Sequence, residues 1–189
     1  MNETSSKQLG RAIKIASKLH YGQIDKAGEP YILHPIAVML KCSPVHEVMM
    51  VAILHDLIED CDINITHLRS LGFPEIVCTG VEAMTRHVIS TDGKIECRMA
   101  KKGDRKEEYQ TFIARIAQNP IACIVKMKDI EHNLSPERLN KLQYNELPPN
   151  ERKHNELLLR LRIEVYRRSQ GELYHFFAGA CLKYYGGMI

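Results

Sequence analysis

Residues 51–60 read VAILHDLIED, an apolar segment that carries four ionisable side chains. The apolar spacing predicts a helix over about residues 43–60, opened by a serine that can cap it and a proline at its first position. On such a helix Glu59 lies one turn from both His55 and Asp56. Charges in apolar surroundings are costly to bury unless they are paired or bind a metal. The segment therefore predicts a buried helix that presents an imidazole and three carboxylates close together.

A solvated helix end is the alternative interpretation of the same charges. It accounts for Asp60, the last residue of the expected helix. It fails for His55 and Asp56, because Leu54 and Leu57 flank them in the most apolar part of the chain. A His-Asp pair alone is a weak signal, so its interpretation depends on partners elsewhere in the sequence.

The remainder of the chain also has helical periodicity, and no run of alternating strand residues appears. Glycine and proline mark the breaks between the periodic segments. Helices are expected over about residues 6–20, 34–40, 64–72, 74–84, 105–118, 120–133, 151–170 and 173–184, with loops over 21–31 and 87–104. The pattern predicts an all-α protein with one domain over residues 1–189.

Composition narrows the class of protein. Hydrophobic residues make up 44% of the 189 residues and charged residues 26%, as in an ordinary globular domain. The net charge of +3 is too small to indicate a nucleic-acid partner. The polar N-terminus and the shortness of the longest apolar stretch predict no membrane partner. Six cysteines without a CxxC pair favour reduced thiols, and together these features predict a cytoplasmic protein.

Two further segments supply partners for His55 and Asp56. His34 stands in YILHP, where the proline helps to fix the chain, and Asp129 stands in the helical run VKMKDIEHN. Asn133 follows Asp129 by four residues and therefore faces the same way. Two imidazoles and two carboxylates form a nitrogen and oxygen set suited to manganese, iron or zinc. The sequence therefore predicts a divalent metal site without thiolates.

The order of these groups resembles that of the HD superfamily of metal-dependent phosphohydrolases. More narrowly, the segments HYGQ…KAGEPYILHP, AILHDLIED, EAMTR and VKMKDIEHN resemble the hydrolase domain of the RelA/SpoT alarmone enzymes and its stand-alone form, the small alarmone hydrolase. The resemblance covers about residues 8–168. It implies an HD-type helical bundle, on which the segment 173–184 is expected to pack as a C-terminal helix.

The resemblance also implies a role for particular residues. The implied metal ligands, for one ion per chain that is expected to be Mn²⁺, are His34, His55, Asp56 and Asp129. The implied catalytic pair, which positions and activates the attacking water, is Glu59 and Asp60. The implied substrate contacts are Lys26, Lys102, Lys106, Asn133, Arg162 and Tyr166, where the two lysines after residue 100 are alternatives from a loose alignment.

The implied reaction is hydrolysis of the 3′-diphosphate of alarmone nucleotides, which releases pyrophosphate. The substrate would be a small nucleotide, ppGpp, with its adenosine analogues as further candidates. No synthetase domain fits in 189 residues, so the enzyme is expected only to degrade. The alternatives are another HD-type nucleotide phosphohydrolase and a nucleotide-binding protein without activity. The sequence leaves the oligomeric state open, with a homo-oligomer as one outcome.

One position departs from the family pattern. Asp25 stands where many members carry an arginine that stacks on the guanine base. A carboxylate cannot supply that cationic stacking. The departure predicts relaxed selectivity between guanine and adenine nucleotides.

Overall fold

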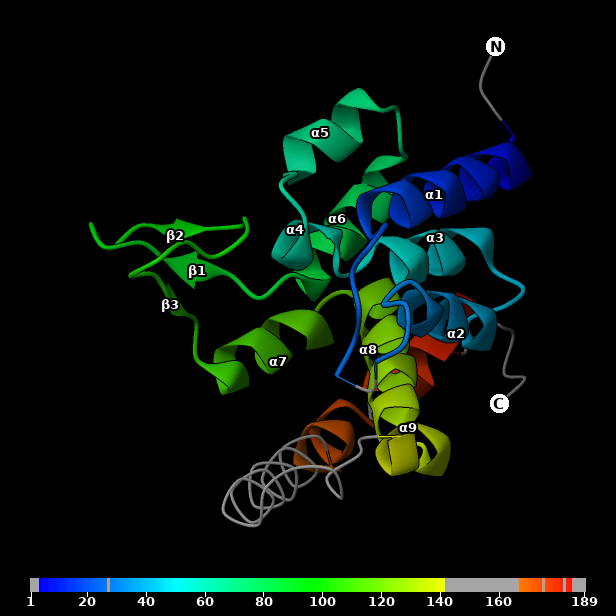
Figure 1. The fold of residues 1–189 in the computed structure, drawn as a ribbon. Coiled ribbons are helices and arrows are strands. Elements are labelled where there is room, and N and C mark those ends of the chain that lie inside the picture. The colour runs from blue at the N-terminus through cyan, green and yellow to red at the C-terminus, as the bar shows by residue number, and fades with distance from the viewer. Residues whose placement is uncertain (1–3, 27, 142–166, 175, 182, 185–189) are drawn as a thin grey trace.

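The computed structural model describes residues 4–26, 28–141, 167–174, 176–181 and 183–184. This part of the chain is mostly helical, with one small sheet (Figure 1). The elements are α1 (Ser5–Leu19), α2 (Leu33–Lys41), α3 (His46–Leu54), α4 (Leu57–Asp60), α5 (Ile65–Ser70), α6 (Glu75–Met84), β1 (Val88–Ile89), β2 (Ile95–Glu96), β3 (Arg105–Lys106), α7 (Tyr109–Ala117), α8 (Pro120–Asn133) and α9 (Pro136–Lys141). The predicted helical fold class is therefore confirmed.

Helix α3 lies at the centre of the helical body, where it packs against α1, α2, α6 and α8. Residues 48–54 are all buried, so the helix is apolar on every side, as expected of a core helix. Complete burial of a side chain such as Leu54 stabilises the fold by about 1.5–3 kcal/mol. The approach of α6 is close, because a Cβ added at Gly80 would lie 2.7 Å from a methyl group of Val51. Only glycine allows this contact between the two helices.

The helix expected over residues 43–60 is two helices, α3 and α4, separated by a turn at His55 and Asp56. Nδ1 of His55 lies 2.7 Å from the carbonyl oxygen of Ala52, which in a continuous helix would accept the Asp56 N–H. The prediction of one continuous helix was therefore wrong at the two residues that carry its chemistry. The start was also misplaced, since α3 begins at His46 after a turn that contains the proline.

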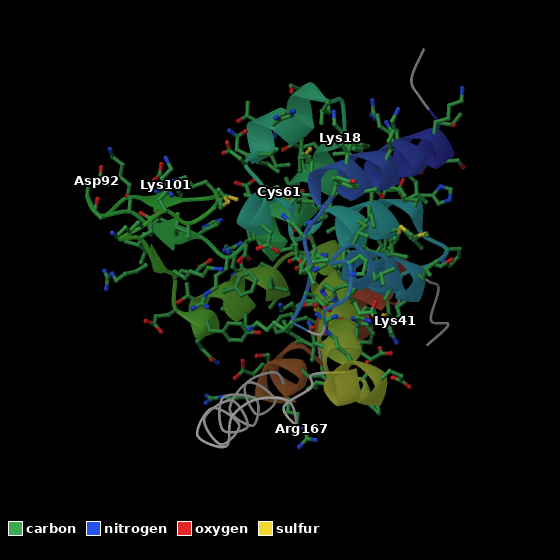
Figure 2. The ribbon with its side chains drawn as sticks, viewed as in Figure 1. Lys18, Lys41, Cys61, Asp92, Lys101 and Arg167 are labelled. Atoms are coloured by element: carbon green, nitrogen blue, oxygen red, sulfur yellow. The ribbon has the colours of Figure 1, made fainter. Side chains whose placement is uncertain are left out.

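The expected loop over residues 87–104 contains part of a three-stranded sheet with the order β2-β1-β3. Strand β1 pairs antiparallel with both neighbours, and Val88 faces Glu96 on one side and Lys106 on the other. The buried Glu107, directly after β3, bonds to the residue before β1, since its carboxylate accepts the His87 N–H at 2.7 Å. Asp92 lies in the turn between β1 and β2 and Lys101 in the segment between β2 and β3, on the part of the chain that extends away from the helices (Figure 2).

The last described segment is helical over residues 167–174 and 176–181. Leu173, Phe177 and Cys181 belong to the same hydrophobic cluster as α3 and α8. The carbonyl of Leu173 also accepts the Cys123 thiol at 3.7 Å. The helix expected over 151–170 falls mostly outside the described residues. Within the described residues, none of the helices has the length and apolar character that crossing a bilayer requires.

Candidate active site

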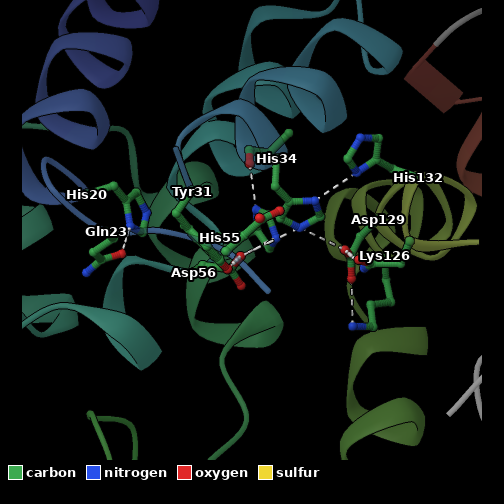
Figure 3. Close-up of polar contacts among 12 residues, drawn as sticks. His20, Gln23, Tyr31, His34, His55, Asp56, Lys126, Asp129 and His132 are labelled. Carbon is green, nitrogen blue, oxygen red and sulfur yellow. Dashed lines mark hydrogen bonds and ion pairs between the residues drawn. The ribbon is translucent and has the colours of Figure 1, made fainter. Parts of the chain in front are cut away.

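Three mutually packed helices bring the four predicted metal ligands to one place (Figure 3). His34 is in the first turn of α2, His55 and Asp56 form the turn between α3 and α4, and Asp129 is in α8. The two histidines and Asp129 are buried, whereas Asp56 is partly exposed. At the break between α3 and α4, His55 and Asp56 therefore lie opposite His34 of α2 and Asp129 of α8.

The donor atoms of this cluster face one another at short range. One atom each from His34, His55 and Asp129 lie within 4.8 Å of one another. Nε2 of His34 is 3.2 Å from Oδ1 of Asp129 and 3.8 Å from Oδ2 of Asp56. Nε2 of His55 is 3.0 Å from the same Asp56 oxygen. Two nitrogen and two oxygen donors that converge in this way fit a divalent metal ion.

The electrostatics of the cluster keep both carboxylates ionised, as ligation requires. Burial acts to raise the pKa of Asp129, but Lys126 and the two imidazoles outweigh it and hold this pKa well below its usual range. Burial also opposes ionisation of Asp56, whose pKa is nevertheless lowered by His55 and His34. The pKa of His55 rises to about 9, because Asp56 and Asp129 outweigh the effect of burial.

Further side chains orient the two carboxylates. Lys126 Nζ is 2.9 Å from Oδ2 of Asp129, and Asn133 Nδ2 donates to Oδ1 at 2.6 Å. The Tyr31 hydroxyl donates to Oδ2 of Asp56 at 2.5 Å. The sequence interpretation found Asn133 but missed Tyr31 and Lys126. Lys126 had a usable signal, because it lies three residues before Asp129 and therefore on the same face of α8.

Both histidines of the cluster also have a partner at the other ring nitrogen. Nδ1 of His55 faces the Ala52 carbonyl, and Nδ1 of His34 lies 2.8 Å from Nδ1 of His132. The pKa of His132 is lowered to about 4 by burial, by His34 and by the positive charge of Arg138. His132 is therefore a neutral imidazole at neutral pH.

The predicted catalytic pair lies in α4, directly after the His55-Asp56 turn. Glu59 is half-buried, and its carboxylate accepts the Arg86 backbone N–H at 2.8 Å and the Lys106 ammonium at 2.6 Å. The pKa of Asp60 is raised by partial desolvation and by the negative charge of Asp56. The two carboxylates thus differ, since one is paired with a cation and the other has a raised proton affinity.

The predicted substrate residues differ in whether the structure places them at the acidic cluster. Asn133 contacts Asp129, and of the two alternative lysines it is Lys106 that reaches Glu59. Lys26 and Lys102 are exposed, in the segment before α2 and in the segment between β2 and β3. Arg162 and Tyr166 lie outside the described residues.

Asp25 has a cationic partner that the sequence did not indicate. Its Oδ2 lies 3.2 Å from Nη1 of Arg138 in α9, and its Oδ1 accepts the Glu29 N–H at 3.0 Å. The carboxylate at position 25 is therefore paired with a guanidinium from a distant segment.

Comparison with known proteins gives related sequences, although no family model matches the chain. A guanosine-3′,5′-bis(diphosphate) 3′-pyrophosphohydrolase of Aquifex aeolicus is 33% identical over 127 residues, 66% of this chain and 17% of the relative. The bifunctional (p)ppGpp synthase/hydrolase SpoT of Escherichia coli is 32% identical over 135 residues, 70% of this chain and 18% of the relative. A GTP pyrophosphokinase of Streptomyces coelicolor is 28% identical over 148 residues, 76% of this chain and 16% of the relative. The chain thus spans under a fifth of the length of these relatives.

A solved structure has the same fold over nearly the whole chain. It is described as "A metazoan ortholog of SpoT hydrolyzes ppGpp and plays a role in starvation responses". The TM-score is 0.56 at 20% identity, and the match covers 97% of this chain and 98% of that one. The interpretation drawn from the sequence motifs is therefore confirmed: in sequence and in fold, this chain is a relative of the SpoT-type (p)ppGpp hydrolases.

Proposed function

We propose that this chain is a metal-dependent phosphohydrolase that removes the 3′-diphosphate of ppGpp as pyrophosphate. The observation that carries the proposal is the convergence of His34, His55, Asp56 and Asp129 beside a helix with two further carboxylates. The relatives named as 3′-pyrophosphohydrolases support the same reaction. A small nucleotide is therefore the proposed substrate.

The proposed metal is one Mn²⁺ per chain, held by those four side chains. When bound, a divalent ion lowers the pKa of water and polarises a phosphoryl oxygen. The protein supplies two Nε2 atoms and two ionised carboxylates for it. Tyr31, Lys126 and Asn133 hold the carboxylates by hydrogen bonds and ion pairs, which restricts their orientation.

The proposed role of the α4 carboxylates is that of a general base for the attacking water. Glu59 and Asp60 orient the water and accept its proton as its oxygen bonds to the phosphorus next to the 3′-oxygen. The bond from that phosphorus to the 3′-oxygen breaks, and the 3′-oxygen is released with a proton as a hydroxyl. Pyrophosphate then carries the oxygen of the water.

The proposed work of the basic residues is to balance phosphate charge. Lys106 is already held at Glu59, so its ammonium is placed beside the acidic pair. Asn133 is proposed to contact substrate from its position on Asp129. Contacts from Lys26, Lys102, Arg162 and Tyr166 stay predictions.

One hydrolase domain over residues 1–189 and a cytoplasmic location also stay proposals. The domain proposal is supported by Leu173 and Phe177, which share the hydrophobic cluster of the central helices.

The reaction itself is the first prediction. With Mn²⁺, the purified protein should convert ppGpp to GDP and pyrophosphate, because the water-activating pair lies beside the proposed metal site. Chromatographic separation of products checks this, with chelator and a deoxynucleoside triphosphate as parallel samples. Release of triphosphate from the deoxynucleotide alone would favour another HD phosphohydrolase. Binding of ppGpp without any product would favour a nucleotide-binding protein.

Base selectivity is the second prediction. The adenosine counterpart of ppGpp should be cleaved nearly as well as ppGpp. Because the carboxylate of Asp25 cannot stack on the base as a cation would, most of the binding energy should come from the diphosphates that both nucleotides share. The measurement is kcat/KM for the two nucleotides. A preference for guanine above about 100-fold, or roughly 2.7 kcal/mol, would contradict the expectation.

Two variants at Asp25 separate the effect of charge from the effect of stacking. Asp25→Asn keeps an oxygen for the Glu29 N–H and removes the charge that pairs with Arg138. Asp25→Arg adds a cation at the same place. If a missing cation at position 25 relaxes the selectivity, Asp25→Arg should raise the preference for guanine more than Asp25→Asn, which only releases the Arg138 guanidinium from its partner.

A further inference from the structure

His34 is held by α8 at both of its ring nitrogens. Nε2 faces Oδ1 of Asp129 at 3.2 Å, and Nδ1 faces Nδ1 of His132 at 2.8 Å (Figure 3). Asp129 and His132 are three residues apart, and so they lie on the same face of α8. One helix face therefore fixes the orientation of this imidazole.

The contact between the two rings requires one proton and one lone pair. A neutral imidazole has a single N–H, so the bond forms only if one Nδ1 donates and the other accepts. If His132 donated, a neutral His34 would carry its own proton on Nε2 and could not bind a metal through that atom. If His34 donates, its Nε2 keeps the lone pair that ligation needs.

The second histidine of the cluster shows the same arrangement with a simpler acceptor. Nδ1 of His55 faces the Ala52 carbonyl at 2.7 Å, and a carbonyl can only accept a hydrogen bond. His55 therefore carries a proton on Nδ1 through its own backbone. His34 depends for the same purpose on a side chain, which a substitution can remove.

We propose that His132 is a positioning residue whose Nδ1 accepts the Nδ1 proton of His34 and so leaves Nε2 of His34 free to bind a divalent metal ion. The proposal rests on the proposed function, because it concerns the same metal site. Partners of this kind to metal-bound histidines typically change metal affinity by about 10–100-fold when they are removed.

The test compares two substitutions that differ in hydrogen-bonding capacity. His132→Leu removes the acceptor at similar size, whereas His132→Asn keeps an oxygen near the position of Nδ1. Calorimetric titration with Mn²⁺ should show a dissociation constant about 10–100-fold higher for His132→Leu and close to that of the unchanged protein for His132→Asn. With ppGpp and saturating Mn²⁺, kcat of His132→Leu should recover, because the ligands themselves are intact.

A matched control comes from another histidine of similar burial. Nδ1 of His46 is 3.1 Å from the Ser5 hydroxyl, at the start of α3 and far along that helix from His55. His46→Leu should leave the affinity for Mn²⁺ unchanged. Thermal unfolding with chelator present shows whether any variant has lost stability rather than metal affinity.

Nitrogen NMR of the protein loaded with Zn²⁺, a diamagnetic ion, at pH about 8, above the ordinary imidazole pKa, reports which Nδ1 carries the shared proton. The proton is expected on Nδ1 of His34, hydrogen-bonded in the unchanged protein and in His132→Asn and without that bond in His132→Leu. This readout remains if His132→Leu folds poorly, because a proton on Nδ1 of His132 in the unchanged protein would overturn the proposal.

Two other results would also overturn it. One is an unchanged Mn²⁺ affinity in a folded His132→Leu protein, and the other is an equal loss in His132→Asn. Failure of the unchanged protein to bind Mn²⁺ would instead refute the proposed function, so the two failures are distinguishable.

Discussion

The His55→Ala protein should bind no divalent metal and should not hydrolyse ppGpp above background. His55 is buried and supplies an Nε2 that faces Asp56 at 3.0 Å, so alanine removes a donor from the centre of the cluster. The remaining carboxylates would then face one another with less compensating positive charge. A metal typically contributes several kcal/mol of transition-state stabilisation, which predicts a loss of about 10³-fold or more.

Metal content by mass spectrometry and product formation by chromatography check this prediction together. His67→Ala is the matched control, because His67 is exposed in α5 and its substitution should change neither value. Asp129→Asn keeps the shape of a second ligand and removes its charge, so it should lose the metal as well. A full complement of metal in His55→Ala would remove that residue from the ligand set.

The helices that the sequence predicted well have signals at their own ends. Helix α8 begins at Pro120 and ends at Asn133, as predicted, and the Asn119 side chain caps it by accepting the Ala122 N–H at 3.0 Å. Proline at the first position and a capping residue before it are local features. Local features can be found from sequence, because the residues that make them are neighbours in the chain.

The elements that the sequence missed depend on contacts or on very short strands. The break between α3 and α4 coincides with a hydrogen bond from the His55 ring to Ala52, which the apolar spacing does not record. The strands contain two residues each, which is too short for an alternating pattern to be detected. The spacing of hydrophobic residues therefore predicted the helical body but not its interruption or its sheet.

In the candidate site, too, the features with a local sequence signal were predicted and the contacts between distant residues were not. The motifs identified His34, His55, Asp56 and Asp129 as a group, and the structure brings them together. The contact between Asp25 and Arg138 joins residues 113 positions apart, and nothing near either residue indicates it. Partners across such distances need a fold before they can be named.

Glu59→Gln should keep the metal and slow the hydrolysis of ppGpp by about 10²–10⁴-fold, the typical contribution of a general base. Glutamine preserves the shape of Glu59 and keeps an oxygen for the Arg86 N–H, which the carboxylate accepts at 2.8 Å. It removes the charge that accepts a proton. Metal analysis and single-turnover rates check the two parts of this expectation separately.

A slow Glu59→Gln enzyme has a second interpretation, because Glu59 also forms an ion pair with Lys106. Their charged atoms are 2.6 Å apart, so the substitution also frees the ammonium from its partner. Lys106→Met removes that ammonium and leaves the Glu59 carboxylate in place. If Glu59 only positions Lys106, the two variants should be equally slow and the double variant no slower. If Glu59 accepts the proton, Glu59→Gln should lower kcat in the presence or absence of Lys106, whereas Lys106→Met should act mainly on KM.

A near-normal rate for Glu59→Gln would instead assign the proton to another group. Asp60, whose pKa is raised by partial desolvation and by Asp56, would be the next residue to test.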